Sequence, residues 1–208
     1  MSSENNKVHN LFSYKGFTKD DLEKIGNSII YFAEKVKNLS KTKLLKLVYL
    51  LDELSVNKYG IPFFNLSYKV WQAGPVNVDI YTELSSTPIL LKDYIKLQFL
   101  QKGECYITPK KKFNDAEFSD NEIGLLEIVL SSYGKLSAKK LVELCHRQTT
   151  LWYQIAKEKG VLELFEKGKL NTTDYEIQLS DNIKDDKVKL SIYDDHREFL
   201  KFSKRFKA

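Results

Sequence analysis

The stretch from Lys43 to Leu84 constrains the fold of this chain more than any other part of the sequence. It opens with an apolar-rich helical pattern that ends at a Tyr-Gly-x-Pro stop, residues 59–62. A partly alternating aromatic segment follows and closes on Trp71-Gln72-Ala73-Gly74-Pro75-Val76, ahead of a second short helix signal. Because no catalytic motif lies within it, the stretch predicts a folded scaffold and not a reactive centre.

Residues 41–58 are expected to form the central helix of the fold. Its apolar surface is wide, which predicts packing contacts on several sides. Gly60 is well placed for the left-handed residue that follows many helices, and Pro62 prevents the helix from resuming. The apolar side chains of this segment are Leu44, Leu45, Leu47, Val48, Leu51, Leu54 and Tyr59.

Lysines crowd the start of this helix, where the helix dipole disfavours cations by roughly 0.3–1 kcal/mol each when they are exposed. The residues are Lys41, Lys43 and Lys46. The preferred interpretation is that their aliphatic stems cover the core while their amines reach water. The alternative is that they hold an acidic group, either internal or on a partner.

Caps and periodicity predict a mainly α fold with a small β element, in a single compact helical domain. Helices are expected at 19–37 after the cap Thr18, after Asn77, after the capping box at Ser119, after Ser137, at 151–157, and after Ser180 or Asp181. The final helix would carry the apolar residues Val188, Ile192, Tyr193, Phe199, Leu200 and Phe206. A short extended segment is predicted at 64–70, ending at Trp71 and a Gly74-Pro75 turn, and a hairpin at 95–99 and 105–107 around Lys102-Gly103.

Three regions are expected along the chain. Residues 1–17 form a polar N-terminal arm, and residues 18–160 form the compact domain. Residues 161–208 form a C-terminal extension whose last helix docks on the domain or on a partner, since a helix with an apolar stripe gains by burying it.

Composition narrows the functional classes. The net charge is +5, but lysines are interspersed with acidic residues and the only compact basic run is Lys110-Lys111-Lys112, so nucleic-acid binding is disfavoured. The two cysteines, Cys105 and Cys145, are too few for a disulfide scaffold and favour the cytoplasm. The sequence contains no run of about eighteen apolar residues, so no membrane span is predicted. No cofactor or metal site is predicted either.

Three features invite a chemical interpretation. Cys145-His146 are neighbours that point about 100° apart on a helix, so a buried core thiol is preferred over a nucleophile or metal site. Asp52 lies within the apolar helix, where a buried structural acceptor or ion-pair member is preferred over a catalyst. For Trp71, beside the Gly74-Pro75 turn, the preferred interpretation is a position in the hydrophobic core. The alternative is a position on a protein-binding surface.

The chain closely resembles the SocA-like antitoxin family with its Panacea domain, over about residues 25–155. The matching family motifs fall, in order, on Lys43, Leu44, Lys46, Leu47 and Tyr49; on Asp52, Tyr59, Gly60 and Pro62; on Trp71, Gly74, Pro75 and Val76, with Tyr81 and Leu84 after them; on Tyr133, Gly134, Leu136 and Ser137; and on His146 and Trp152. A histidine common in the family's second helix is Ser55 here. The acidic, proline-containing segment usual before the last tryptophan is Arg147-Gln148-Thr149-Thr150.

The resemblance implies a bacterial or prophage antitoxin of a two-gene module, with a cognate protein toxin as partner and the motif residues in structural or partner-binding roles. It implies no enzymatic activity. One kind of member instead delivers its toxin to an ATP-dependent Clp protease, and this adaptor role is the first alternative. A DNA-binding autorepressor acting through Lys110–Lys112 and an enzyme using Cys145 and His146 are the others. The sequence leaves open whether the chain forms a homo-oligomer.

Overall fold

A computed structural model describes residues 16–100 and 103–206, with side-chain exposure up to residue 202. The expected mainly helical class with a small β part is confirmed. The chain divides into two compact units, which are Met1–Leu47 with Asn77–Leu141, and Val48–Val76 with Val142–Ala208. We call them unit 1 and unit 2. Helix α3 (Lys41–Tyr59) begins in unit 1 and ends in unit 2, and so does α6 (Ala138–Cys145).

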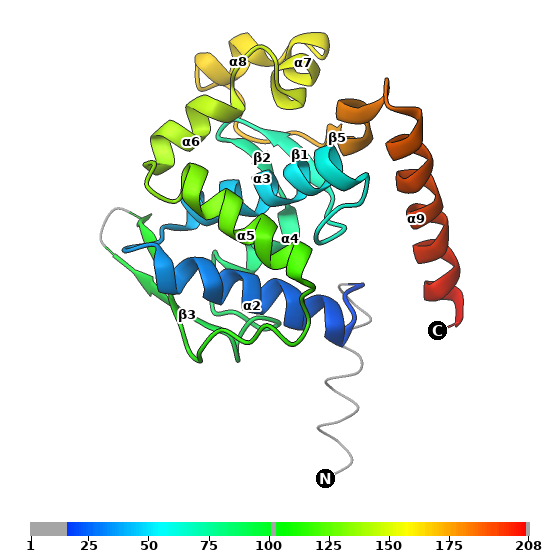
Figure 1. Ribbon diagram of the computed structural model, residues 1–208. Coiled ribbons are helices and arrows are strands. Elements are labelled where there is room, and N and C mark those ends of the chain that lie inside the picture. The colour runs from blue at the N-terminus through cyan, green and yellow to red at the C-terminus, as the bar shows by residue number, and fades with distance from the viewer. Residues whose placement is uncertain (1–15, 101–102, 207–208) are drawn as a thin grey trace. The chain divides into compact units, whose positions relative to one another are not determined.

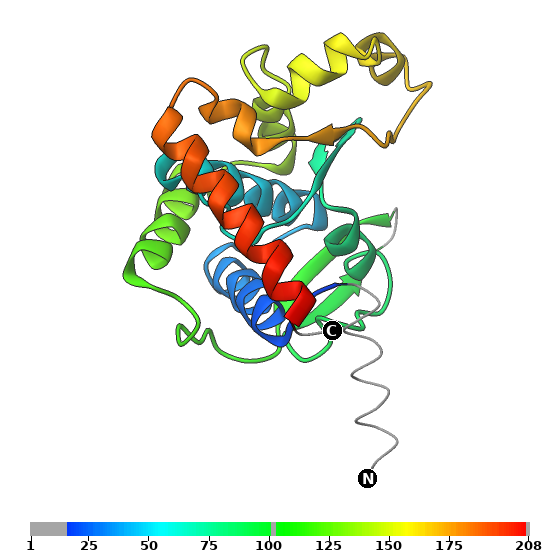
Figure 2. The ribbon, with the colours of Figure 1, turned by 90° about the vertical axis from the view of Figure 1, so that its right-hand side faces the viewer.

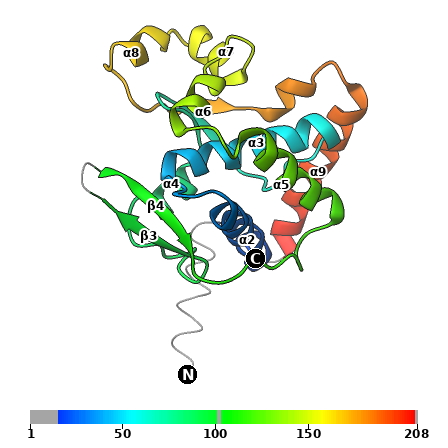
Figure 3. The same ribbon diagram turned by 60° about the vertical axis from the view of Figure 1, so that its left-hand side comes forward.

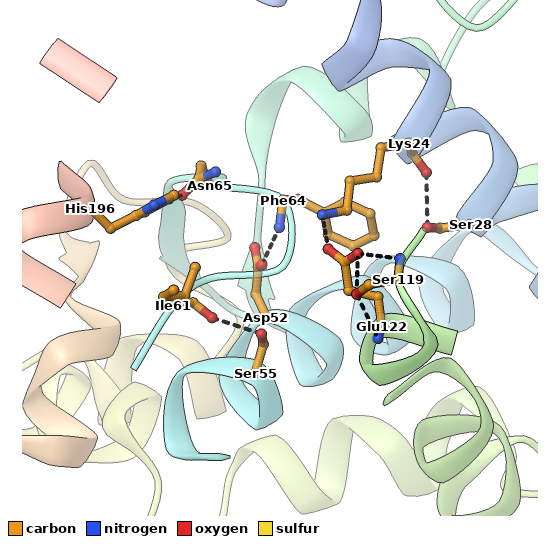
Figure 4. Close-up of polar contacts among 10 residues, drawn as sticks. All are labelled: Lys24, Ser28, Asp52, Ser55, Ile61, Phe64, Asn65, Ser119, Glu122 and His196. Atoms are coloured by element: carbon orange, nitrogen blue, oxygen red, sulfur yellow. Dashed lines mark hydrogen bonds and ion pairs between the residues drawn. The ribbon is translucent and has the colours of Figure 1, made fainter. Parts of the chain in front are cut away.

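Unit 1 is built on helix α2 (Lys19–Lys35), which contacts α5 (Asp120–Tyr133) and the hairpin of β3 (Ile95–Phe99) and β4 (Cys105–Pro109) (Figures 1 and 3). Both helices begin at the predicted capping residues, since Thr18 and Ser119 each form a complete capping box. The Glu122 carboxylate of the second box also pairs with Lys24 of α2 (Figure 4). The box therefore ties α5 to its neighbour as well as starting it.

Unit 1 also contains α4 (Val78–Glu83), and its start at Asn77 is as predicted, because the Asn77 side chain accepts from the backbone N–H of Ile80 at 2.8 Å. Glu83 at the end of α4 is buried and accepts the N–H groups of residues 89–91 at 2.8–3.1 Å. The carboxylate thus provides the hydrogen-bond acceptor that these backbone N–H groups would otherwise find in a helix or a sheet.

Unit 2 contains a three-stranded antiparallel sheet of order β2-β1-β5, formed by β1 (Tyr68–Trp71), β2 (Gly74–Val76) and β5 (Glu176–Ile177). Helix α7 (Leu151–Glu158) contacts β1 and β5, and α8 (Leu162–Glu166) follows it. The tail continues through the 3₁₀ helix η2 (Leu179–Ile183) into α9 (Lys187–Phe206), which Figure 2 shows along its whole length in red.

Several sequence predictions in unit 2 were wrong. The predicted turn at Gly74-Pro75 is strand β2, since Val70 pairs with Pro75 and Trp71 with Gly74. The extended segment at 64–70 is a strand only from Tyr68, after a left-handed Asn65 with φ of 57°. Ser180 and Asp181 do not cap the last helix; they lie in η2, and α9 begins six residues later. Strand β5 and helix α8 were not predicted.

The remaining local predictions agree with the structure. Gly60 has φ of +73°, and α3 ends at the preceding residue. Helix α2 ends at Lys35, two residues earlier than expected, and α5 ends at the predicted Gly134, although in right-handed conformation. Residues 1–15 of the predicted arm and Lys102 of the predicted hairpin turn lie outside the described residues. The boundary proposed at residue 160 stays a prediction.

Candidate protein-binding site

About half of the motif residues lie in unit 2, where Asp52 forms the polar centre of the apolar helix α3. Its side chain is fully buried and accepts from the backbone N–H of Phe64 at 2.6 Å (Figure 4). It also accepts from the Tyr68 hydroxyl at 2.7 Å. Burial raises the pKa of the Asp52 carboxyl to about 6, although the hydrogen bonds from Phe64 and Tyr68 act in the opposite direction. The prediction of a buried structural acceptor is confirmed, since Asp52 fixes the segment between α3 and β1.

Tyr49 and Glu53 extend this polar cluster by one turn of α3. The Tyr49 hydroxyl donates to Glu53 Oε1 at 2.8 Å, and its ring meets Tyr68 edge-to-face with centroids 5.1 Å apart. Asn182 donates to the same Glu53 oxygen at 3.3 Å. Burial raises the pKa of Glu53, and burial together with Glu53 raises the pKa of Tyr49. Asp52 and Glu53 therefore serve separate partners, as expected for adjacent helical residues.

The stop after α3 is held by contacts within unit 2. The Ser55 hydroxyl, at the position where the family commonly has histidine, donates to the carbonyl of Ile61 at 2.7 Å. Tyr59 is half-buried and Pro62 is buried. A Cβ on Gly60 would lie 2.7 Å from the carbonyl oxygen of Lys189 in α9, so this glycine is required both by its conformation and by the close approach.

Trp71, Gly74, Pro75 and Val76 form a hairpin that is fastened to distant parts of unit 2. The indole N–H of Trp152 donates to the Trp71 carbonyl at 2.9 Å, and the Trp71 indole N–H donates to the carbonyl of Thr173 at 3.2 Å. The preference for Trp71 as core is supported only in part, because the residue is half-buried while Trp152 is 2% exposed.

Beside this hairpin lies a cavity of about 280 Å³ with largely aromatic walls, which we call the aromatic cavity. The His146 ring stacks on Trp152 with centroids 3.8 Å apart and planes 10° apart, and Phe165 stacks on Trp152 at 5.8 Å. Gln72 donates from Nε2 to the Phe165 carbonyl at 2.6 Å, which holds α8 against the hairpin. The cavity is lined by Gln72, His146, Trp152, Tyr153, Leu162, Phe165 and Glu166.

The motif residues of unit 1 include Lys43, Lys46 and Tyr81. Lys43 donates to the Gly134 carbonyl at 2.7 Å, and burial lowers its pKa. The Tyr81 ring lies 4.3 Å from the amine of Lys41. Lys46 is only 1% exposed, so the interpretation in which the lysine amines reach water is wrong for this residue. The motif residues at the start of α3 therefore belong to unit 1, whereas those around Asp52 and the hairpin belong to unit 2.

The residues singled out for possible chemistry, Cys145 and His146, have separate surroundings. Cys145 is a buried free thiol, which confirms its predicted place in the core, and the His146 ring stacks on Trp152 in the aromatic cavity. Among residues 16–100 and 103–206, no three metal-binding side chains gather into a group that could hold an ion. The aromatic cavity, at about 280 Å³, lies just below the roughly 300–1,000 Å³ typical of small-ligand sites.

Sequence reasoning missed Gln72, Tyr153, Leu162, Phe165 and Glu166 as residues of this cavity. Gln72 was inside a recognised motif, at a variable position, and its neighbours in α8 carried no family motif. The apolar residues Leu162 and Phe165, three apart after the left-handed Gly160, were the available signal for a short helix with one buried face.

Comparison with known families identifies the core of the chain. The model of the family described as "Antitoxin SocA-like, Panacea domain" matches residues 44–153. This range includes α3 from Leu44 onward, the β1–β2 hairpin, Cys145-His146 and Trp152, and it excludes α8, β5 and α9. No curated protein and no solved structure matched the chain. In the part of the chain that the structure describes, no helix has the length and apolar character needed to cross a membrane.

Proposed function

Because the chain belongs to the SocA-like antitoxin family with its Panacea domain, we propose that it neutralises a cognate protein toxin by binding it directly. The match over residues 44–153 is the observation that carries this proposal. The toxin is the product of the other gene of a two-gene module, and both proteins act in the cytoplasm. The chain acts by occupying a surface of the toxin and not by catalysis.

The geometry of unit 2 supports a binding role. The aromatic cavity is walled by stacked rings that are held by hydrogen bonds to β1 and α8, so its shape exists before a partner arrives. A preformed pocket that accepts one anchoring side chain avoids part of the ordering entropy of association. The aromatic cavity therefore receives an apolar or aromatic side chain of the toxin.

The first test is co-expression. The product of the adjacent gene, expressed alone, is expected to arrest growth, and co-expression of this chain is expected to restore it. Leu162→Trp fills the aromatic cavity and is expected to weaken binding of that product at least tenfold, about 1.4 kcal/mol. Leu164→Trp is the matched control, because Leu164 is on the same helix, outside the cavity and 39% exposed. An adjacent product that is harmless alone would contradict the proposed function.

Neutralisation by sequestration and by proteolytic delivery differ in one measurement. If the chain only binds the toxin, the half-life of the toxin in cells with active Clp protease is unchanged or longer when this chain is present. A shorter half-life that depends on Clp protease would assign the adaptor role instead.

A further inference from the structure

Helix α9 lies outside the family-matched segment and carries large apolar side chains on an exposed face. Val188 is 71% exposed, Ile192 37%, Phe199 67% and Phe202 55%. With Asp195, these residues are spaced by four, three, four and three positions, which places all five on one side of the helix. We call this set Val188, Ile192, Asp195, Phe199 and Phe202 the outer seam of α9.

The outer seam is not the face by which α9 packs in unit 2. Tyr193 is buried, and His196 lies 2.7 Å from Asn65 through its Nε2 atom (Figure 4). The backbone of Lys189 approaches Gly60 closely. At 100° per residue, Tyr193 points about 140° away from Val188. The helix is thus fixed along one side and presents a second apolar side to solvent.

The exposed area is large enough to indicate an interaction surface. With about 200 Å² per ring, the two phenylalanines alone expose roughly 240 Å². Val188 and Ile192 bring the outer seam into the range of roughly 300–600 Å² at which the largest patch on a monomer is often functional. The seam extends over about 21 Å, the length of two heptads.

Asp195 decides which partner fits. It lies in the middle of the outer seam, is exposed, and forms no ion pair with any described residue. A second copy packed in parallel would place Asp195 against itself. An antiparallel copy that joins Val188 to Phe202 and Ile192 to Phe199 places Asp195 on the two-fold axis, again against itself. Like charges removed from water repel each other, so a second copy is disfavoured.

We propose that the outer seam of α9 binds an amphipathic helix of the toxin that carries a lysine or arginine among apolar residues. The basic residue faces Asp195, and the apolar residues pack on the two halves of the seam. A single polar pair in such a seam fixes the register and excludes partners that lack the opposite charge. This inference rests on the proposed function and assigns to α9 the selection of one toxin by the chain.

Charge reversal at the centre of the outer seam tests the proposal. Asp195→Lys is expected to weaken binding of the purified product of the adjacent gene at least tenfold in a titration, and to reduce neutralisation on co-expression. Asp194→Lys is the matched control, because it makes the same charge change at the neighbouring exposed residue, about 100° away from Asp195 around the helix. The control is expected to bind within twofold of wild type. One basic-to-Asp change in the toxin is expected to restore binding to Asp195→Lys.

A second variant tests the apolar part of the surface independently. Phe199→Ser with Phe202→Ser is expected to weaken binding at least tenfold, whereas Ile89→Ser, at a site 56% exposed in unit 1, is expected to leave it unchanged. Circular dichroism verifies that each variant is folded.

The outcomes separate this inference from the proposed function. If the wild-type chain binds the product of the adjacent gene and both seam variants bind it with the same affinity, the inference is overturned. The proposed function is then left intact. Wild type that neither binds nor neutralises that product overturns both. Light scattering that shows a wild-type dimer, and a monomer for Phe199→Ser with Phe202→Ser, would assign the outer seam to a second copy instead.

Discussion

The carboxyl of Asp52 illustrates how one buried group can organise a segment and limit stability at the same time. Its hydrogen bonds hold Phe64 and Tyr68 in place, and removal of this acceptor would leave the donors unsatisfied. Burial nonetheless penalises the ionised form more than the hydrogen bonds favour it, because its pKa is about 6 in the folded chain against an ordinary value of 3.8. The folded chain therefore binds this proton more tightly than the unfolded chain does.

This preference predicts the sign of a pH dependence. The contribution of Asp52 to the free energy of unfolding is fully present below about pH 4 and is lost as the pH rises through about 6, since the unfolded chain ionises first. The loss is on the order of 3 kcal/mol. Urea denaturation at pH 4, 5, 6 and 7 measures it, and Asp52→Asn is expected to remove this part of the slope. In Asp52→Asn, a smaller dependence of the unfolding free energy on pH, of the same sign, is expected to remain because the pKa of Glu53 is also raised.

The control for this prediction is Asp194→Asn, which removes an exposed carboxylate and is expected to keep the wild-type slope. A slope for Asp52→Asn that equals that of wild type would show that Asp52 does not titrate between pH 4 and 6.

Among the secondary-structure elements, α9 depends on a single glycine for its seating in unit 2. Gly60→Ala combines a left-handed residue, roughly 1–2 kcal/mol for an L-amino acid, with a Cβ placed 2.7 Å from the Lys189 carbonyl oxygen. We expect it to lower the free energy of unfolding by more than the conformational term and to speed amide hydrogen exchange in the first turns of α9.

Gly160→Ala separates the two causes. Gly160 has a similar φ of +67°, but a Cβ there would meet nothing within 4 Å. It should lose only the conformational term and leave exchange in α9 unchanged. Equal losses in the two variants would mean that the contact between Gly60 and Lys189 carries no energy.

Which elements could be predicted follows from where their determinants lie. The starts of α2, α4 and α5 depend on caps within three residues, and Thr18, Asn77 and Ser119 all fulfil that role. Strand β2 depends on pairing with β1, and β5 on pairing with residues more than a hundred positions earlier. A Gly-Pro pair is typical of a turn, but pairing with the neighbouring strand β1 decided the structure here.

At the scale of the whole molecule, the candidate site could be predicted only where it overlaps the family motifs. Trp71, His146 and Trp152 were identified by their motifs, although nothing local showed that His146 would stack on Trp152 or that Phe165 would complete the cavity. Lys43 and Asp52 share helix α3, yet one hydrogen-bonds within unit 1 and the other within unit 2. The order of motifs in the sequence therefore did not reveal that they serve two compact units.

Because α3 and α6 are continuous helices that each belong to both units, the two units are expected to unfold together. Gly26→Ala provides the test, since its Cβ would lie 2.2 Å from the ring of buried Tyr94 within unit 1. Overpacking of this kind costs roughly 1–3 kcal/mol. Both tryptophans, Trp71 and Trp152, lie in unit 2, so their fluorescence reports on the unit that does not carry the substitution.

If fraying of α3 in unit 1 also removes helical hydrogen bonds that continue into unit 2, the denaturation midpoint measured by tryptophan fluorescence falls together with that measured by far-ultraviolet circular dichroism. We expect the two midpoints to coincide in wild type and to shift equally in Gly26→Ala. A fluorescence midpoint that stays at the wild-type value while the helical signal develops an earlier transition would contradict this coupling. Unit 2, with the aromatic cavity and the outer seam of α9, would then be stable without unit 1.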